Sequence, residues 1–319
     1  MMTKPIAMRD ALLEQIHQAM AEDDKIFFLS ADFGSPVLDR IRADFPARFL
    51  NVGIAEQNLI NVASGLGLEG YKVFAYAIAP FITMRCFEQI RVNLALLSVV
   101  RPMNVNLIGV GAGMSYVVSG PTHQCYEDLS LIRSLPNVEL YSPSDHVTSA
   151  ALSKVCLERQ SIKYLRLDAQ VLPKIYADEI LDVSAGYNVL RSGNGVCLVA
   201  TGYMVHKALK VADYFKERGQ EIGVIDLHCL TGFDERELTN HLANYKDVFS
   251  MEEGFRYRGG LDARLQEMME NQNFSIRFNS IGVEASYRYE LGSREDLHAH
   301  SGIGEKDIIF KVDQKLKNK

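Results

Sequence analysis

Apolar and polar positions along the first half of the chain alternate between two spacings, one typical of helices and the other of buried strands. Residues 8–22 carry apolar side chains at helical spacing, and a short, nearly continuous apolar run follows at 25–29. The same pattern predicts strands at 49–52, 71–77, 103–109 and 137–141, and helices at 55–68, 79–98 and 125–134. Strands that alternate with helices favour a parallel sheet that helices cover on both faces.

A polar, irregular stretch from Asp168 to Gly186 interrupts this alternation. The pattern then restarts, with strands at 195–200, 221–226, 247–252 and 276–283 and helices at about 203–218, 234–243 and 305–317. The fold class that we predict is therefore α/β, as two doubly wound α/β domains. We expect the first domain over residues 1–170, a linker over 171–185 and the second domain over 186–319.

Length and composition fit an ordinary globular protein. The chain has 319 residues, room for about two domains, and 47% of them are hydrophobic while 23% are charged. The net charge is -6 and the Lys and Arg residues are scattered, so the sequence offers no basic surface for nucleic acid. No stretch of about 20 uninterrupted apolar residues could span a membrane.

The start of the chain and its cysteines favour a cytoplasmic location. Residues 1–20 lack the apolar core and the cleavage site of a signal peptide. The cysteines form no C-x-x-C pair, so buried free thiols in a reducing cytosol are expected rather than a disulfide framework or a zinc site. They are Cys86, Cys125, Cys156, Cys197 and Cys229.

The segment 49–58, Phe-Leu-Asn-Val-Gly-Ile-Ala-Glu-Gln-Asn, runs from a short apolar strand through a glycine turn into a helix. Apolar positions recur at Leu59, Ile60 and Ala63, so one side of that helix is buried and Glu56 stands in its first turn. We therefore expect Glu56 to be exposed at the mouth of a cleft. The alternative is that Glu56 only complements the helix dipole.

Gly65, Gly67 and Gly70 fit the G-x-G-x-x-G pattern of dinucleotide-binding proteins and so suggest a nicotinamide-dependent oxidoreductase. Dinucleotide binding needs such glycines after a strand and at the start of a helix, where free N–H groups meet the pyrophosphate. Here they follow the helix 55–68 and precede the strand 71–77. Because that order is reversed, we expect these glycines to end the helix and make a tight turn.

The string Asn51-Val52-Gly53-Ile54-Ala55-Glu56-Gln57-Asn58 resembles a motif of the transketolase and deoxyxylulose-phosphate synthase family. The resemblance implies thiamine diphosphate as the cofactor, with Glu56 bound to its aminopyrimidine ring. A Glu that shares a proton with ring N1′ favours the imino tautomer, which can take a proton from the thiazolium carbon. Glu56 would then be a positioned general acid and base.

The run Arg85-Cys86-Phe87-Glu88-Gln89-Ile90-Arg91 resembles a second segment of the family, R-A-[WFY]-[DE]-Q-I-R. By that match Phe81 stacks on the pyrimidine, and Tyr76 and Phe87 are weaker candidates for the same role. The alternative is that all three are core aromatics, as large aromatic side chains mostly are.

Gly120-Pro121-Thr122-His123-Gln124 matches a family segment at the mouth of the substrate site. The Gly and Pro fix a tight turn, and a His beside it can donate to a substrate oxygen or relay a proton near neutral pH. The resemblance makes His123 a catalytic candidate and a substrate contact, whereas a loop His alone would more often be inert. The turn Ser30-Ala31-Asp32-Phe33-Gly34 resembles the family's S-A-D-L segment, which implies that Asp32 lies close to the thiazolium; the alternative is a solvated turn residue.

The family holds its acceptor phosphate with two Arg, a Ser and a His, and the resemblance supplies Arg9, Ser35 and Arg166 as three of these. Two guanidinium groups around one pocket make a good anion clamp, although ordinary ion pairs are the alternative. Gly111 falls where transketolases have a His, and Ser119 falls where both enzyme groups have an Asp. Since those side chains contact sugar hydroxyls and phosphate in the family, the usual pentose phosphates are not the expected substrates.

In family terms, residues 1–170 look like the pyrimidine-binding domain and residues 186–319 like the transketolase C-terminal domain. The domain that binds the diphosphate through Mg2+ carries a G-D-G run, and no G-D-G occurs in this sequence. The resemblance therefore implies the C-terminal subunit of a split transketolase-like enzyme. It would transfer a two-carbon ketol unit from a ketose-type donor to an aldose-type acceptor, on a modified sugar or sugar phosphate. The N-terminal, thiamine-diphosphate-binding subunit would supply the Mg2+ ligands, in an α2β2 assembly, and this chain would supply none.

Two alternatives to this function stay open. One is a pyruvate-using acyloin synthase of the deoxyxylulose-phosphate synthase type. The other, from a different class, is a noncatalytic regulatory subunit that has kept the fold and lost the chemistry. The joint presence of Glu56 and His123 argues against the second alternative.

Overall fold

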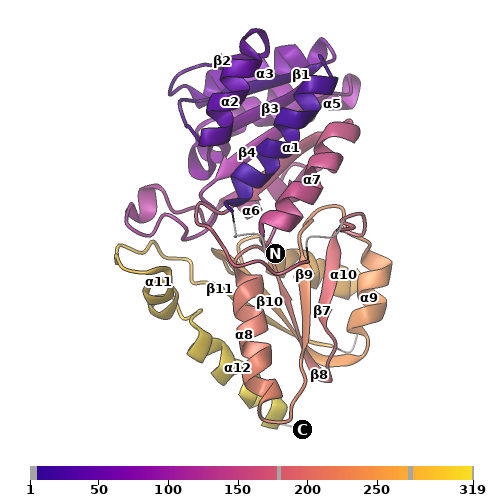
Figure 1. The fold of residues 1–319 in the computed structure, drawn as a ribbon. Coiled ribbons are helices and arrows are strands. Elements are labelled where there is room, and N and C mark those ends of the chain that lie inside the picture. The colour runs from indigo at the N-terminus through magenta and orange to yellow at the C-terminus, as the bar shows by residue number, and fades with distance from the viewer. Residues whose placement is uncertain (1–5, 178–180, 272–275, 318–319) are drawn as a thin grey trace.

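The computed structural model describes residues 6–177, 181–271 and 276–317, and each half of the chain builds a sheet of its own. The first half forms the upper part of the molecule in Figure 1 and the second half the lower part. Helices lie outside the central sheet in both parts. The predicted fold class, two doubly wound α/β domains, is confirmed.

The first sheet has six parallel strands in the order β2-β1-β3-β4-β6-β5. They are β1 (Ile26–Ser30), β2 (Phe49–Asn51), β3 (Lys72–Ile78), β4 (Asn104–Val110), β5 (Val138–Tyr141) and β6 (Ile162–Leu167). One face is covered by α1 (Met8–Glu22), α2 (Pro36–Asp44) and α7 (His146–Glu158), and the other by α3 (Glu56–Leu68) and α6 (Asp128–Arg133). Because the strands are parallel, the loops after their carboxyl ends meet at one edge of the sheet. Glu56 follows β2, Phe81 follows β3, and His123 lies in the loop after β4.

The second sheet has the order β11-β10-β8-β9-β7, in which β7 alone runs antiparallel to its neighbour. Its strands are β7 (Tyr187–Arg191), β8 (Gly195–Ala200), β9 (Gly223–Leu227), β10 (Tyr245–Phe255) and β11 (Arg277–Val283). One face packs against α8 (Met204–Lys216) and α12 (Glu305–Lys317), and the other against α9 (Glu235–Leu242) and α10 (Leu261–Asn271). The remaining helix, α11 (Arg294–His300), lies beside α8 in the lower part of Figure 1.

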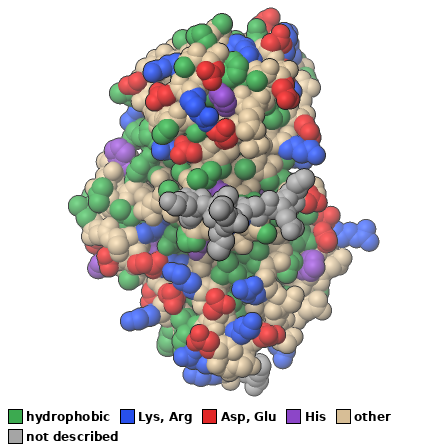
Figure 2. Space-filling view, viewed as in Figure 1, with side chains coloured by type: hydrophobic (Ala, Val, Ile, Leu, Met, Phe, Trp, Pro, Cys, Tyr) green, Lys and Arg blue, Asp and Glu red, His purple; other side chains and the backbone are tan. Residues whose placement is uncertain are grey.

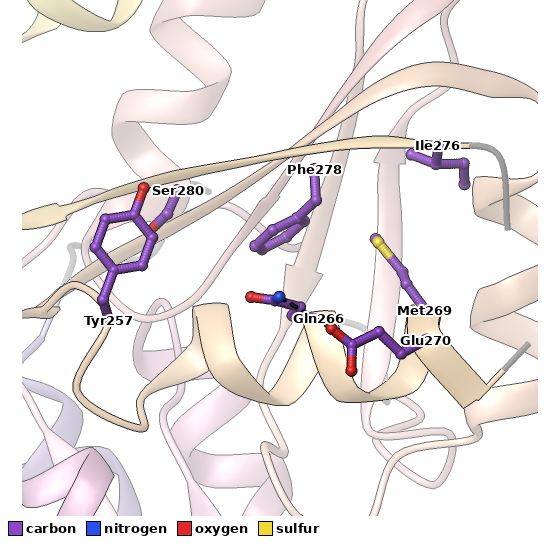
Figure 3. Close-up of a pocket in the computed structure, with 7 residues that line it drawn as sticks. All are labelled: Tyr257, Gln266, Met269, Glu270, Ile276, Phe278 and Ser280. Atoms are coloured by element: carbon purple, nitrogen blue, oxygen red, sulfur yellow. Dashed lines mark hydrogen bonds between the residues drawn. The ribbon is translucent and has the colours of Figure 1, made fainter. Parts of the chain in front are cut away.

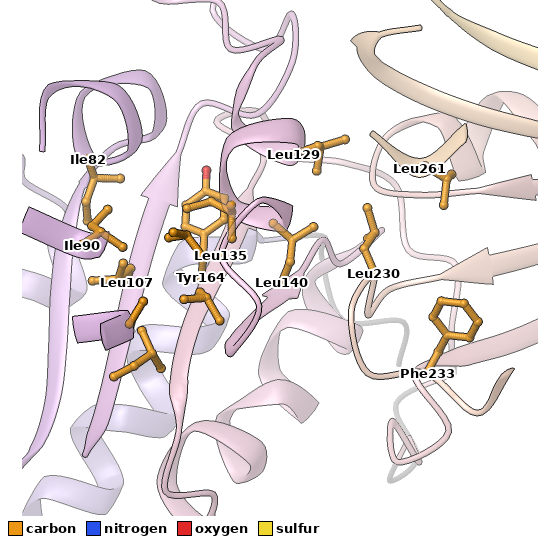
Figure 4. Close-up of a cluster of buried hydrophobic side chains, with 14 of the residues drawn as sticks. Ile82, Ile90, Leu107, Leu129, Leu135, Leu140, Tyr164, Leu230, Phe233 and Leu261 are labelled. Atoms are coloured by element: carbon orange, nitrogen blue, oxygen red, sulfur yellow. The ribbon is translucent and has the colours of Figure 1, made fainter. Parts of the chain in front are cut away.

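The two halves share one hydrophobic core. Figure 4 shows the cluster continuing from Leu129 and Leu140 in the first half to Leu230 and Leu261 in the second. Backbone hydrogen bonds reinforce this junction: the Ser142 N–H donates to the carbonyl of His228 (2.8 Å), and the Leu230 N–H donates to the carbonyl of Leu140 (2.8 Å). A change at this junction can therefore reach the loops that surround the first sheet.

The segment predicted as one helix over 79–98 is instead a broken helical run. It consists of two π-helical turns, η2 (Phe81–Arg85) and η3 (Ile90–Leu96), separated by α4 (Phe87–Gln89) and followed by α5 (Leu97–Val100). The Thr83 hydroxyl donates to the carbonyl of Ala79 (2.7 Å) and the Cys86 thiol to that of Ile82 (2.7 Å), so side chains occupy carbonyls that a regular helix would use. Such π-helical turns are frequent at functional sites.

The three glycines that mimic a dinucleotide motif have packing and turn roles. Gly65 and Gly67 lie within the last turns of α3, and a Cβ at Gly67 would stand 2.9 Å from a methyl carbon of Val105 on β4. Gly70 has φ +83° in the turn that leads to β3. The predicted helix end and tight turn are thus present, although the helix runs past Gly65 and Gly67.

The surface carries both signs of charge. On the face drawn in Figure 2, Lys and Arg side chains are interspersed with Asp and Glu side chains over both halves. All five cysteines are buried and unpaired, as predicted. Among the helices that the structure describes, none combines the length and the apolar character needed to cross a bilayer.

Candidate active site

Glu56 begins α3 and is buried, with 5% of its side chain exposed, so the prediction of an exposed carboxylate is wrong. Arg85 pairs with it and donates from one terminal nitrogen to both carboxylate oxygens (3.0 and 3.2 Å). The Gln57 amide also donates to the carbonyl of Arg85 (3.1 Å), so the π-helical turn is tied to the start of α3. The side chain of Arg85 and its carbonyl thus both bond to the first turn of α3.

The same guanidinium covers an aromatic ring. Its central carbon lies 3.7 Å from the centroid of Phe81, four residues earlier in the π-helical turn, which is a close cation–π contact. The ring of His123 packs edge-on against Phe81, with centroids 5.2 Å apart. The structure thus brings Glu56 and Phe81 together at Arg85, with His123 packed on Phe81, although the three residues follow three different strands.

His123 is held by the turn that precedes it. Its Nδ1 lies 3.0 Å from the Thr122 hydroxyl, which leaves Nε2 as the ring nitrogen free to meet a ligand. The ring of Tyr116 stands on its other side, with centroids 6.1 Å apart. Sequence reasoning missed Tyr116. A Cβ at Gly111 would overlap the Tyr116 ring, so the glycine marks the space that this ring fills.

Arg9 lies in a second, more polar part of the site, near two tyrosines. Burial raises the pKa of both Tyr76 and Tyr116, and the positive charge of Arg9 opposes that rise in each, so the guanidinium lies near both phenols. Arg9 also pairs with Asp10 (3.4 Å). Tyr76 itself is fully buried and stacks on Phe33, with centroids 5.1 Å apart, as a core aromatic would.

Three other predicted residues lie outside this cluster in the described part of the chain. Asp32 is exposed with φ +52°, and its carboxylate accepts from the Asn51 amide (3.0 Å). Ser35 caps α2, since its hydroxyl accepts from the N–H of Leu38 (3.1 Å). Ser119 is exposed in the turn before Gly120. Phe87, the weaker stacking candidate, packs against the hydrophobic core.

Arg166 does not join Arg9 as the predicted anion clamp. Its side chain is 2% exposed, and its Nε donates to the Asp128 carboxylate (2.8 Å). A terminal nitrogen donates to the carbonyls of Cys125 (3.2 Å) and Glu253 (3.0 Å). These donors are committed to the protein, so Arg166 links the loop after β4 to the second half of the chain.

A buried ionic network packs against the loop after β4. Glu253 accepts from Arg294 Nε (2.9 Å) and from His298, and although burial would raise the pKa of its carboxyl, these partners lower it well below its usual range. Arg294 also pairs with Asp168 (2.7 Å), which follows β6. A Cβ at Gly113 would overlap the Glu253 side chain, so the loop approaches the network closely.

A groove of about 550 Å3 lies elsewhere, between α10 and β11 (Figure 3). Its lining is Tyr257, Gln266, Met269, Glu270, Ile276, Phe278 and Ser280. The carboxylate of Glu270 accepts from the amide of Gln266 (3.0 Å). These seven residues include neither a histidine nor a cation, so the groove offers no acid–base pair. Within the described residues, no group of His, Cys, Asp and Glu is arranged to hold a metal ion.

Comparison with known proteins gives consistent matches. A family model for the transketolase pyrimidine binding domain covers residues 4–174, and one for the transketolase C-terminal domain covers residues 186–308. An apulose-4-phosphate transketolase subunit from Actinobacillus succinogenes is 30% identical over 83% of this chain and 84% of that protein. A 6-deoxy-6-sulfo-D-fructose transketolase subunit from Clostridium sp. is 27% identical over 95% and 92%. A solved split-gene transketolase, an inactive beta4 tetramer, matches with a TM-score of 0.85 at 30% identity over 98% of this chain and 99% of that one.

Proposed function

This chain belongs to the transketolase family, and we propose that it is the C-terminal subunit of a split, thiamine-diphosphate-dependent enzyme. The enzyme transfers a two-carbon ketol unit from a ketose-type donor to an aldose-type acceptor. This chain provides the pyrimidine end of the cofactor site. The observation that carries the proposal is the pairing of a buried carboxylate, Glu56, with a neighbouring aromatic ring, Phe81.

The residues present suit the pyrimidine ring. Between Glu56 and Phe81 the structure already holds a flat group that donates N–H to the acid and lies against the aromatic face, namely the guanidinium of Arg85. An aminopyrimidine ring is likewise flat and can donate an N–H to a carboxylate. Glu56 and Phe81 thus offer the two contacts that such a ring needs.

Each residue then has a role at a stated atom. The bound cofactor supplies a carbon nucleophile and an electron sink for the carbons that are cleaved and joined. The Glu56 carboxyl shares a proton with ring N1′, and the Phe81 ring holds the pyrimidine in place. His123, through Nε2, donates to a substrate oxygen or moves its proton. Tyr116 and Arg9 line the polar side, where the phenol can donate to a hydroxyl and the guanidinium can bind an anion.

A partner subunit completes the site in this proposal. No G-D-G run occurs in the sequence, so we place the diphosphate and Mg2+ ligands on an N-terminal subunit, in an α2β2 assembly in the cytoplasm. Two large apolar side chains lie exposed in the segments that carry Glu56 and His123, which suits a surface that a partner covers. They are Ile54 and Val118. The relatives named as transketolase subunits, and the solved tetramer described as inactive, support this division.

The substrate that we propose is a modified sugar with an anionic group. Gly111 and Ser119 lack the side chains that the family uses on ordinary pentose phosphates, and Tyr116 fills the space at Gly111 instead. The named substrates of two relatives are apulose 4-phosphate and 6-deoxy-6-sulfofructose, both modified and anionic. Because Arg166 is committed to Asp128, Arg9 is the cation that we assign to the anionic end.

The test is reconstitution with a subunit that carries a G-D-G segment, followed by assays of ketol transfer on a panel of sugars. We expect transfer to or from sugars with deoxy, branched or sulfonated groups, and a lower specificity constant with ordinary pentose phosphates. Transfer from pyruvate alone would assign the acyloin synthase instead. A complex that binds the cofactor and transfers nothing would assign the noncatalytic subunit.

A further inference from the structure

Arg85 occupies both of the groups that the proposed cofactor ring needs. Its terminal nitrogen donates to the two oxygens of Glu56 (3.0 and 3.2 Å), and its central guanidinium carbon lies 3.7 Å from the centre of the Phe81 ring. While Arg85 is in this position, a second flat group cannot stack on the same face of Phe81 or take the same hydrogen-bonding position on Glu56. The ring and the Arg85 side chain therefore exclude each other.

We propose that Arg85 closes the pyrimidine site in the cofactor-free chain and is displaced when the ring binds. The inference rests on the function proposed above and goes beyond it by giving the site a closed and an open state. In the closed state the guanidinium satisfies the buried carboxylate of Glu56, which would otherwise be left without a partner. In the open state ring N1′ satisfies the same carboxylate.

The exposure of Arg85 makes this exchange feasible. Its side chain is 47% exposed, so it can turn into water without desolvation and recover hydration that it lacks in the closed state. The backbone need not move, because the carbonyl of Arg85 stays bonded to Gln57 (3.1 Å) while the side chain turns. A fully buried pair such as Arg166 with Asp128 has no such route.

The exchange also predicts selectivity for the ligand. A ring that donates N–H to Glu56 replaces the lost guanidinium contact, whereas a flat ring without that nitrogen leaves a buried carboxylate unpaired. Arg85 would therefore act as a filter that admits only rings able to partner Glu56. Arg85 would exclude neutral rings more effectively than flat cations, because a flat cation can itself pair with Glu56 and stack on Phe81.

The experiment measures the dissociation constant of thiamine diphosphate for the reconstituted complex at saturating Mg2+ by calorimetric titration. In Arg85→Gln the ring no longer has to displace an ion pair and a cation–π contact, so we expect binding tighter by roughly five- to thirtyfold. Arg85→Lys keeps the charge but not the flat fork, and we expect an intermediate value. The matched control is Arg91→Gln, which removes a guanidinium of nearly equal exposure (46%) from the same helical run, paired with Glu88, and should change the constant by less than about twofold.

Ionic strength gives a second measurement, in which wild type is compared with either variant of Arg85 at low and at high salt. Raising it from about 0.05 M to about 0.5 M weakens the Arg85–Glu56 pair, so the ratio of dissociation constants between wild type and Arg85→Lys, or Arg85→Gln, should move toward one. An Arg85→Gln complex that binds the cofactor equally well or more weakly overturns the inference alone. A wild-type complex that binds no thiamine diphosphate overturns the proposed function and this inference with it.

Discussion

Arg85 and Arg166 each donate to a carboxylate at about the same distance, 3.0 Å to Glu56 and 2.8 Å to Asp128, yet the two pairs sit in opposite surroundings. Arg85 is 47% exposed above an acid that is 5% exposed, whereas Arg166 and Asp128 are 2% and 0% exposed. The first pair can open toward water on one side. The second is enclosed by carbonyls from both halves of the chain.

The contrast shows that two ion pairs of the same chemistry suit different uses because they are buried to different extents. Breaking a buried pair leaves an uncompensated charge in the interior, so such a pair is suited to hold loops in place. A pair with one exposed partner can exchange that partner for a ligand at little cost, because the arginine turns into water while the ligand takes over the buried acid. Arg166, which the family resemblance assigned to the substrate, is in the enclosed pair, whereas Arg85, which the resemblance did not assign, is in the pair that opens to water.

The largest expected effect is the loss of turnover in Glu56→Gln, which keeps the size of the side chain and removes the proton that ring N1′ shares. Removal of a positioned acid or base lowers the rate by about 100- to 10,000-fold, and we expect a fall in kcat of the reconstituted complex within that range. The control is Glu88→Gln, which alters an exposed acid paired with Arg91 in the next helical segment. A Glu56→Gln complex within about threefold of wild type would mean that the acid only stabilises the start of α3.

The next effect concerns stability. Arg166→Met removes the cation that neutralises the buried carboxylate of Asp128, and it removes the donor to two carbonyls. Among the described residues the carboxylate then keeps only the Tyr164 hydroxyl and the Leu129 N–H as donors. The free energy of unfolding should therefore fall by about 3–5 kcal/mol. Arg159→Met is the matched control, because Arg159 is 49% exposed and pairs with Glu139; it should change the same quantity by less than about 1 kcal/mol. Denaturant unfolding of the purified chain measures both. Equal losses of unfolding free energy in the two variants would contradict the view that the buried pair contributes more to stability than the exposed pair.

Asp226 extends the comparison to a buried acid that has no arginine. Its carboxylate accepts from the hydroxyls of Ser144 (2.5 Å) and Tyr176 (2.7 Å), and burial raises the pKa of the group from 3.8 to about 7. The folded chain therefore holds an extra proton between about pH 4 and about pH 7, and the contribution of Asp226 to stability falls as the pH rises through that window. Asp226→Asn should lack this decline and be more stable than wild type at pH 8, by about 1–4 kcal/mol.

The measurement is the difference in unfolding free energy between wild type and Asp226→Asn across the same pH range. Taking the difference removes the contributions of other groups, including Glu252, whose pKa burial also raises to about 7. The interpretation predicts a difference near zero at pH 4 that grows toward pH 8. A difference that is constant with pH would show that Asp226 is ionised in both the folded and unfolded chain.

Local patterns in the sequence were sufficient for most of the fold. The apolar spacing over 8–22 predicted α1 with its observed bounds, and the apolar runs predicted every described strand except β6, an inner strand of the first sheet, and β7. The spacing failed over 79–98, because the π-helical turns arise when side chains such as Thr83 and Cys86 take backbone carbonyls, which apolar periodicity does not report.

The candidate site was predictable as far as single motifs extend. Glu56, Phe81 and His123 each lie in a segment that resembles the family, and the parallel sheet brings the three segments to one edge. The roles of Arg85, Tyr116 and Arg166 depend on contacts between loops distant in sequence. Whether a charge is buried depends on those contacts, so the spacing of residues along the chain could not distinguish the exposed Arg85 from the buried Arg166.

We propose that this chain holds only the pyrimidine end of the thiamine diphosphate site. The most direct test is a calorimetric titration of the cofactor, with and without Mg2+, into the purified chain, into the partner subunit and into their complex. We expect Mg2+-dependent binding by the complex at least about a hundredfold tighter than by this chain alone, since the diphosphate and the metal contribute much of the affinity. Tight, Mg2+-dependent binding by the isolated chain would contradict the account.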